Sequence, residues 1–255
     1  MVWDPSLYLT FEDHRNRPAT ELAARIPLTA PKRIVDLGCG PGNSTRLLAE
    51  RWPDAEIIGV DNSDEMLDSA RKSGVNATWI KDDVAKWTPD GPVDCIFSSA
   101  ALHWAGDHFS LFPKLLSYIA PGGALAVQMP YNFPAPSHRL IHAVAIGKKW
   151  SVDLNAVRDP YPVSEAKEYY SWLREAGAKV DIWHTEYLHV LQGQDAVFRW
   201  VSGSTMTPYI AALPKAEADE FAEACRARLA AAYPPTPHGE TLYAFTRLFI
   251  VALKT

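Results

Sequence analysis

Short apolar runs alternate with amphipathic stretches between residues 33 and 129. The apolar runs are RIVDLG, EIIGVD, ATWIKDD, VDCIFSSA and ALAVQM, and the helix-like stretches between them include NSTRLLAERW, SDEMLDSARKSG and HFSLFPKLLSYIAPGG. This rhythm predicts strands joined by helices, and therefore an α/β fold with a parallel sheet and right-handed crossovers. Asn43 and Ser63 mark predicted helix starts, and Gly122-Gly123 marks the predicted start of the fifth strand.

The pattern changes after Met129. Helices are predicted near 137–150, in SEAKEYYSWLREAG and in KAEADEFAEACRARLAAAY, and long strands in VDIWHTEYLHVL and LYAFTRLFIVAL. These last two strands are long enough to form a hairpin-like edge on the sheet. No linker-like stretch interrupts the chain, so we expect one domain over 1–255, in which residues 1–30 and about 194–236 form a helical lid over the core.

Composition narrows the class of protein. With 255 residues, 47% of them hydrophobic, the chain is long enough to bury a large core. The net charge of −5 and the scattered lysines and arginines argue against a nucleic-acid partner and favour a small molecule. Cys39, Cys95 and Cys225 show no metal or disulfide spacing, and no apolar run is long enough to span a membrane. We expect a cytoplasmic monomer without a metal.

The strongest local signal is the glycine run VDLGCGPGN between a predicted strand and a predicted helix. Glycines there let the backbone approach a ligand closely. Asn43 stands where a dinucleotide fingerprint has its third glycine, and the carboxylate of Asp36 repels phosphate but suits an ammonium group. The run therefore favours a cofactor with a methionine moiety over a pyrophosphate.

Two further carboxylates end the next two strands. Asp61 closes EIIGVD, where it can accept from both ribose hydroxyls, and Asp83 lies in WIKDDVAKW, where it can accept from an adenine amino group, with Asp82 as a substitute. Each one alone is more typical of a helix cap or turn. At the ends of successive strands they are expected to converge on one crevice.

The run VDLGCGPGNST, followed by VDNSDEML, DDVAKW and SSAALHW, resembles the class I methyltransferase family. More narrowly, the segments WDPSLYLTFEDHRNRPATELAARI, ALHWAGDHFSLFPKLL, LAVQMP, VDIWHTEYLHVL and RLFIVA are similar to those of the trans-aconitate 2-methyltransferase family from end to end. The resemblance implies a Rossmann-like seven-stranded sheet with helices on both faces. It also implies methyl transfer from S-adenosylmethionine to a carboxylate of a small polycarboxylic acid such as trans-aconitate, giving a monomethyl ester and S-adenosylhomocysteine.

By that resemblance, Asp36, Gly38 and Gly40 would hold the methionine end of the cofactor, and Asp61 with Asn62 its ribose and adenine. The remaining expected cofactor contacts are Met66, Asp83, Val84, Ser98 and Arg15, the last of which could serve either the cofactor's carboxylate or the acid.

Methyl transfer to a carboxylate needs no catalytic base, because the nucleophile is already ionised at neutral pH. Binding of a polyacid does require cationic and hydrogen-bonding side chains from the protein. The candidates are His103, Trp104, Tyr131, Tyr187, His189, Arg199, Trp200 and Tyr209. Structural interpretations stay open for several of them: a loop histidine for His103, a buried core position for Trp200, and one face of an edge strand for Tyr187 and His189.

Three alternatives to this function remain. A methyltransferase of the same fold could act on a hydroxyl or carbon of another metabolite, with a base near His103. A nicotinamide-dependent oxidoreductase is disfavoured by Asn43 and Asp36. A non-catalytic cofactor-binding module is compatible with the aromatic residues of the lid. Methylation of nucleic-acid amino groups is disfavoured, since SSAALHW stands where an N-P-P-Y type motif would be.

Overall fold

The computed structural model describes residues 12–157 and 163–255, with side chains from residue 16 onward. The strands are β1 (Arg33–Leu37), β2 (Glu56–Asp61), β3 (Thr78–Lys81), β4 (Val93–Ser99), β5 (Ile119–Pro130), β6 (Ala178–Leu191) and β7 (Thr241–Lys254). The helices are α2 (Glu12–Arg25), α3 (Asn43–Arg51), α4 (Asp64–Lys72), α5 (His108–Ser117), α6 (Pro136–Ile146), α7 (Ala166–Glu175), α8 (Ala196–Ser202), α9 (Thr207–Ala212) and α10 (Lys215–Ala232), with short 3-10 turns η1 (Leu102–Trp104) and η2 (Leu154–Ala156).

The strands form one seven-stranded sheet in the order β3-β2-β1-β4-β5-β7-β6. Neighbours from β3 to β5 are parallel, and β7 runs antiparallel to β5. The chain moves from β1 outward to β3 and then returns to β4 beside β1, so the direction of winding reverses between β1 and β4. Such a switch point opens a crevice at the carboxyl ends of the strands. The predicted α/β fold and the edge formed by the last two strands are confirmed.

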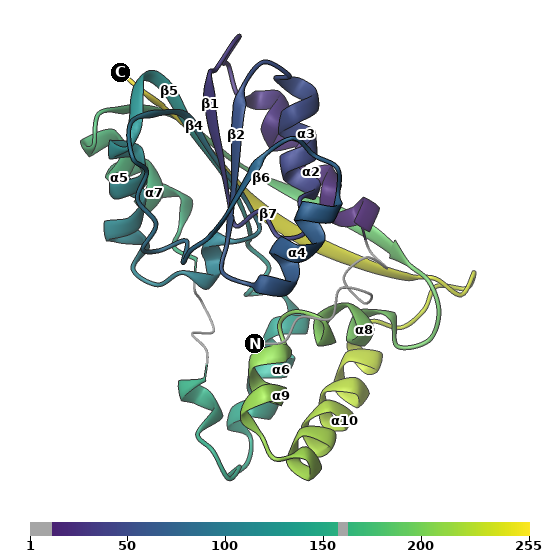
Figure 1. The fold of residues 1–255 in the computed structure, drawn as a ribbon. Helices are drawn as coiled ribbons and strands as arrows, with labels where there is room; N and C mark the ends of the chain where they lie inside the picture. The colour runs from purple at the N-terminus through teal and green to yellow at the C-terminus, as the bar shows by residue number, and fades with distance from the viewer. Residues whose placement is uncertain (1–11, 158–162) are drawn as a thin grey trace. The chain divides into compact units, whose positions relative to one another are not determined.

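Helices cover both faces of this sheet. Figure 1 shows α2, α3 and α4 on one face and α5 and α7 on the other. Ser63 caps α4 by accepting from Met66 N, as predicted. At α3 the capping position is instead Gly42, which has a left-handed backbone, and Asn43 is the first helical residue. No helix in the described part of the chain is long and apolar enough to cross a membrane.

The predicted start of the fifth strand at Gly122-Gly123 is wrong, because β5 already begins at Ile119. The register between β4 and β5 shifts between Val93 and Cys95. At Gly123 a Cβ would lie 2.5 Å from the backbone oxygen of Asp94. The glycines therefore accommodate an irregular stretch inside the strand and do not mark its start.

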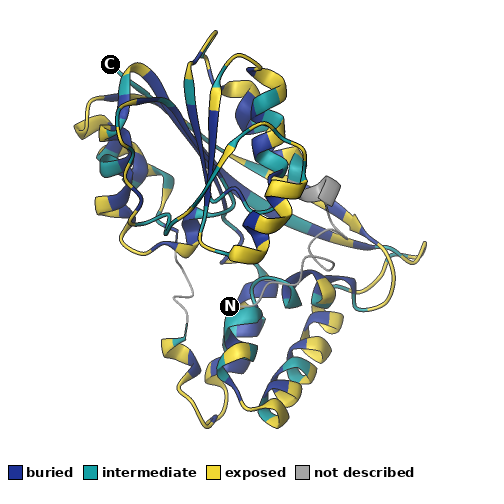
Figure 2. Ribbon diagram, viewed as in Figure 1, coloured by how far each residue is buried: buried dark blue, intermediate teal, exposed yellow. Residues whose placement is uncertain are grey.

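The chain divides into two compact units. Among the described residues, the larger unit contains 12–130, 163–185 and 247–255. Its central strands are buried, and the outer faces of its helices are exposed (Figure 2). The carboxyl ends of β1, β2 and β4 belong to this unit, which therefore carries the predicted cofactor site.

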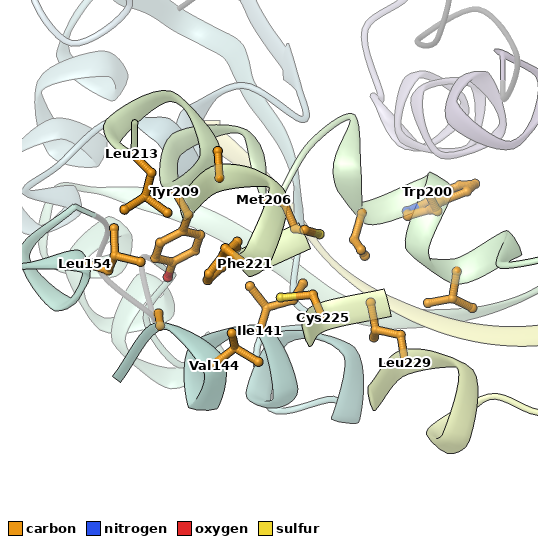
Figure 3. Packing of buried hydrophobic residues seen from close by; sticks show 14 of the residues in the cluster. Ile141, Val144, Leu154, Trp200, Met206, Tyr209, Leu213, Phe221, Cys225 and Leu229 are labelled. Carbon is orange, nitrogen blue, oxygen red and sulfur yellow. The ribbon is translucent and has the colours of Figure 1, made fainter. Parts of the chain in front are cut away.

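The other unit contains, among the described residues, 131–157 and 186–246. Phe221, Cys225 and Leu229 repeat every four residues along α10 and share one buried cluster with Ile141 and Val144 of α6 (Figure 3). This spacing is that of a helix buried along one face. Helices α8, α9 and α10 fall within the segment assigned to a lid and have this apolar core of their own. The lid itself stays a prediction, and its residues 1–11 lie outside the described part.

Candidate active site

The glycine run forms the loop between β1 and α3. Gly38 N and Cys39 N donate to Val60 O at 2.8 and 3.0 Å, which holds the loop against the end of β2. Gly38 has φ +85, and a Cβ there would lie 2.1 Å from Cβ of Ala101. Among the described residues, no atom lies within 4 Å of a Cβ placed at Gly40. The loop is therefore packed tightly against the turn after β4 at Gly38 and is open at Gly40.

Asp61 joins the glycine loop to the start of α4. Its Oδ2 accepts from Gly40 N at 2.9 Å and its Oδ1 from Ser63 N at 3.0 Å. The residue is half-buried. Because each carboxylate oxygen has two lone pairs, both oxygens can accept a second hydrogen bond. Asp61 is thus oriented by the backbone while still able to accept from a ligand's hydroxyl groups.

Asp36 is fully buried at the base of the loop. Its Oδ2 accepts from Ser44 Oγ and Thr45 Oγ1, both at 2.7 Å, and so connects β1 to the first turn of α3. Its Oδ1 has no hydrogen-bond partner among the described residues. Burial raises the pKa of Asp36 to about 6, although the two hydroxyl donors lower it. Asp36 therefore has a structural role that the sequence did not indicate, in addition to its predicted cofactor role.

The other predicted cofactor residues surround this loop. Val84 Cγ1 lies 3.8 Å from the position of a Cβ at Gly38. Ser98, fully buried, donates to Leu37 O at 2.7 Å. Asp83 accepts from Ala85 N at 2.9 Å.

Met66 is buried in α4, and Asn62 is exposed directly after β2. The side chain of Arg15, in α2, lies outside the described residues. The larger unit thus carries all the predicted cofactor residues, and their roles toward the cofactor stay predictions.

The turn η1 follows β4 and carries His103 and Trp104. His103 is buried, Trp104 is exposed, and their ring centroids are 4.8 Å apart. The turn is held by His108, whose Nε2 bonds to Leu102 O at 2.8 Å and whose Nδ1 bonds to the hydroxyl of Tyr169 at 2.6 Å. Burial lowers the pKa of His108. A neutral imidazole can donate to the carbonyl and accept from the hydroxyl at once, so His108 positions η1 without a charge.

The remaining substrate candidates belong to the other unit. The ring of His189 stacks on Trp200 with centroids 4.7 Å apart and is parallel to that of Tyr187 at 6.2 Å. Trp200 and Tyr209 belong to the buried cluster of this unit. The core interpretation of Trp200 and the edge-strand alternation of Tyr187 and His189 are therefore confirmed. Their roles in binding an acid stay predictions.

Arg199 and Tyr131 are less buried than these aromatic residues. Arg199 is exposed, and its Nη2 donates to Gln192 O in the turn before α8. Tyr131 is half-buried and its backbone N donates to Thr246 O at 2.9 Å. In the described contacts Arg199 thus stabilises its own turn, which the sequence did not indicate.

Sequence reasoning missed a buried polar group at the carboxyl end of β5. Gln128 is fully buried, and its Oε1 accepts from Ser99 Oγ and from Arg247 Nη1, each at 3.3 Å. Arg247 is itself only 4% exposed. The sequence signal that could have indicated this buried polar group is the single polar residue in each of the apolar runs ALAVQM and RLFIVAL. Nothing local in the sequence indicates that the two side chains meet.

The residues at the glycine loop fit S-adenosylmethionine. A positively charged ammonium group suits the buried Oδ1 of Asp36, which lacks a described partner. The open backbone at Gly40 lies next to the oriented carboxylate of Asp61. The arrangement offers acceptors for an ammonium and for ribose hydroxyls, and it lacks the third glycine that a pyrophosphate site would use.

Comparisons with known proteins agree with this arrangement. A family model described as a methyltransferase domain matches residues 34–123. The fold resembles that of the YcgJ protein from Bacillus subtilis, with a TM-score of 0.61 at 16% identity over 93% of this chain and 98% of that one. It also resembles phosphoethanolamine N-methyltransferase 2 from Haemonchus contortus in complex with S-adenosyl-L-methionine, with a TM-score of 0.54 at 16% identity over 94% and 53% of the two chains.

Fold and site together define a class I methyltransferase whose methyl donor is S-adenosylmethionine. Two full-length relatives narrow the class. The trans-aconitate 2-methyltransferase of Methylobacterium nodulans is 45% identical over 254 residues, covering 99% of this chain and 98% of that protein. That of Azoarcus sp. (strain BH72) is 43% identical over 253 residues, covering 99% of each. The chain belongs to the trans-aconitate 2-methyltransferase family.

Proposed function

We propose that this protein methylates a carboxylate of a small polycarboxylic acid, with trans-aconitate as the substrate and its monomethyl ester as the product. The observation that carries the proposal is the identity of 43–45% over 99% of the chain to proteins named for that reaction. Identity at this level extends beyond the glycine loop, which many methyltransferases share, to the segments outside it.

In this proposal the glycine loop and the carboxylates around it hold the cofactor. Asp36 accepts from the ammonium of its methionine moiety, Asp61 accepts from the ribose, and Asp83 accepts from the adenine amino group. When bound, S-adenosylmethionine supplies a methyl group on a positively charged sulfur, and transfer of that methyl to one carboxylate oxygen leaves S-adenosylhomocysteine and an uncharged ester group on an acid that keeps its other carboxylates. The protein's own contribution is to align the two reactants and to exclude water, which can account for about 7–11 kcal/mol of barrier in favourable cases.

No proton has to be removed from the acid, because carboxyl groups titrate near pH 4. We therefore assign no catalytic base. In this proposal His103 and Trp104, in the turn η1 after β4, contribute to acid binding. We also propose a cytoplasmic location, which the buried free thiols of Cys39, Cys95 and Cys225 suit.

The test is a transfer assay with isotopically labelled S-adenosylmethionine and a panel of di- and tricarboxylic acids, hydroxy acids and unrelated hydroxyl compounds. We expect label in an alkali-labile ester of trans-aconitate and little transfer to the hydroxyl compounds. Label found only in an ether or on carbon would overturn the proposal and favour the hydroxyl or carbon alternative. Binding of the cofactor without transfer to any compound would favour a non-catalytic module.

A further inference from the structure

The turn η1 lies between two non-glycine residues with left-handed backbone conformations. Ala100, before the turn, has a φ of 55°, and Asp107, after it, has a φ of 50°. Such conformations cost free energy at a residue that carries a Cβ, and they persist where surrounding contacts hold them. The turn itself is short, and its own backbone hydrogen bonds close at 3.0 and 2.9 Å. Contacts from neighbouring elements must therefore hold η1 in this conformation.

His108, the first residue of α5, provides one of these contacts. Its Nε2 bonds to Leu102 O at 2.8 Å. A carbonyl oxygen only accepts, so Nε2 carries a proton and donates. Burial lowers the pKa of His108, although the backbone carbonyls around it and the carboxylate of Asp107 raise it, so the ring is neutral above pH 7. In a neutral ring with its proton on Nε2, Nδ1 is an acceptor, and it accepts from the hydroxyl of Tyr169 at 2.6 Å.

Tyr169 of α7 selects this tautomer. Its hydroxyl oxygen accepts from Ser164 N at 3.1 Å, and its hydroxyl proton is directed at Nδ1 of His108. With the proton on Nδ1 instead, Nε2 would present a lone pair to the carbonyl oxygen of Leu102. Tyr169 is 0% exposed and His108 6%, so water has little access to either bond. The chain of bonds from Ser164 to Leu102 therefore has one direction, and it ends at η1.

The turn is held at two separate points. Before η1, Ala100 N donates to Gln128 O at 2.9 Å, and the next residue packs against Gly38 of the glycine loop. Within η1, His108 holds Leu102 O. The first attachment fixes the packing of the turn on the glycine loop. The second fixes the part of the turn that carries the two side chains proposed to contact the acid.

We propose that His108 is a positioning residue for acid binding: with its tautomer selected by Tyr169, it holds η1 in the conformation in which His103 and Trp104 contact the acid. His108 acts through the turn and not on the reactants. Because the attachment to the glycine loop is separate, loss of the bond from His108 affects the acid more than the cofactor. The inference rests on the proposed function, since it assigns the geometry of the acid-binding turn to residues outside that turn.

Two amide replacements separate the two bonds of His108. The glutamine amide reaches about as far as Nε2, so His108→Gln retains a donor for Leu102 O. The asparagine amide reaches only about as far as Nδ1, so His108→Asn retains a partner for Tyr169 but loses the bond to the turn. Tyr169→Phe removes the hydroxyl that selects the tautomer. Leu115→Ala is the matched control, because Leu115 is fully buried in the same helix and its loss destabilises the protein without removing a hydrogen bond to η1.

Acid binding is measured separately from turnover. Trans-aconitate is titrated calorimetrically into the complex of each protein with S-adenosylhomocysteine, and KM, kcat, S-adenosylhomocysteine affinity and Tm are determined. Hydrogen exchange of the backbone amides of Trp104 and Ala105 reports on the turn itself and requires no acid.

We expect His108→Asn to raise Kd and KM for the acid by about tenfold, because η1 then occupies its binding conformation only part of the time. Saturating acid restores that conformation, so kcat should change by less than about two-fold, as should the affinity for S-adenosylhomocysteine. His108→Gln should stay within about three-fold of the wild type, and Tyr169→Phe should lie between the two variants. Amide exchange in η1 should follow the same order. Leu115→Ala should lower Tm at least as much as His108→Asn and leave KM unchanged.

The inference is overturned if folded His108→Asn binds the acid within about two-fold of the wild type, or if the asparagine and glutamine variants weaken binding equally. A rise in KM for Leu115→Ala as large as that for His108→Asn would also overturn it, since general destabilisation would then be sufficient. Should His108→Asn fail to fold, a lack of effect in Tyr169→Phe decides against the inference. Failure of the proposed function is separate: the wild type would then methylate no carboxylic acid, and amide exchange in η1 would still show whether His108 holds the turn.

Discussion

At the scale of single residues, Asp61 combines a structural and a predicted binding role. It accepts from Gly40 N and Ser63 N. We expect Asp61→Ala to weaken S-adenosylmethionine binding by about tenfold to a few hundred-fold, since two charge-assisted hydrogen bonds of ~1.5–3 kcal/mol each are partly replaced by water. Calorimetry with the cofactor measures the effect. Asp68→Ala is the control, because its exposed pair with Arg71 contributes little. Unchanged affinity in a protein with native melting would remove Asp61 from the ribose site.

Asp36 gives a prediction about pH and stability. Its folded pKa of about 6 exceeds the unfolded value of 3.8, so the folded state binds more protons in this window. The wild type should therefore lose stability as pH rises from about 4 to 6, by up to about 3 kcal/mol relative to Asp36→Asn, which does not titrate. Urea unfolding of both proteins at about pH 4.5 and pH 7.5 measures the difference. A difference that does not change with pH would contradict the burial of an ionisable carboxyl.

At the scale of an element, the close packing of the glycine loop leads to a prediction about the free energy of unfolding. Gly38 and Gly74 have φ values of +85 and +76, and of these two only Gly38 has an atom of the described residues close to the position of an added Cβ. Gly74→Ala should therefore cost about 1–2 kcal/mol of unfolding free energy for the left-handed backbone alone. Gly38→Ala should cost about 1–3 kcal/mol more for the clash with Ala101. Urea unfolding of the pair checks this, and equal losses in the two variants would show that the loop can move away from the turn after β4.

At the scale of the whole molecule, the absence of a required base predicts a flat pH–rate profile. We expect kcat/KM for the acid, measured at saturating S-adenosylmethionine, to stay constant between about pH 7 and pH 9, because the acid is fully ionised throughout and the Asp36 carboxyl, with a pKa of about 6, is ionised as well. His103→Ala should lower activity without changing the shape of the profile. His238→Ala, at an exposed turn, is the control for loss of a histidine. A bell-shaped profile that disappears only in His103→Ala, measured under single-turnover conditions, would favour a hydroxyl substrate.

The local pattern of polar and apolar residues was sufficient to predict much of the fold. The apolar runs predicted the parallel strands, the polar residue at Ser63 predicted the cap of α4, and the spacing of apolar residues predicted α10. The glycine run and Asp61 were recognisable because their function depends on backbone conformation and on the position after a strand, both of which leave a mark within a few residues. For this reason the sequence predicted the cofactor more readily than the substrate.

Tertiary structure alone decided which distant side chains meet. Arg247 and Gln128 are 119 residues apart and meet because β7 pairs with β5 in one register. Period-two alternation predicts which side chains share a face, but it does not predict the neighbour on the next strand. The same holds for Trp200, whose stacking on His189 joins a helix to a strand. The sequence by itself determined the class of sheet, the glycine loop and the cofactor. The burial of the Arg247 cation and its contact with Gln128 depended on pairing between strands far apart in the chain, because a strand's own residues specify its faces but not its partner.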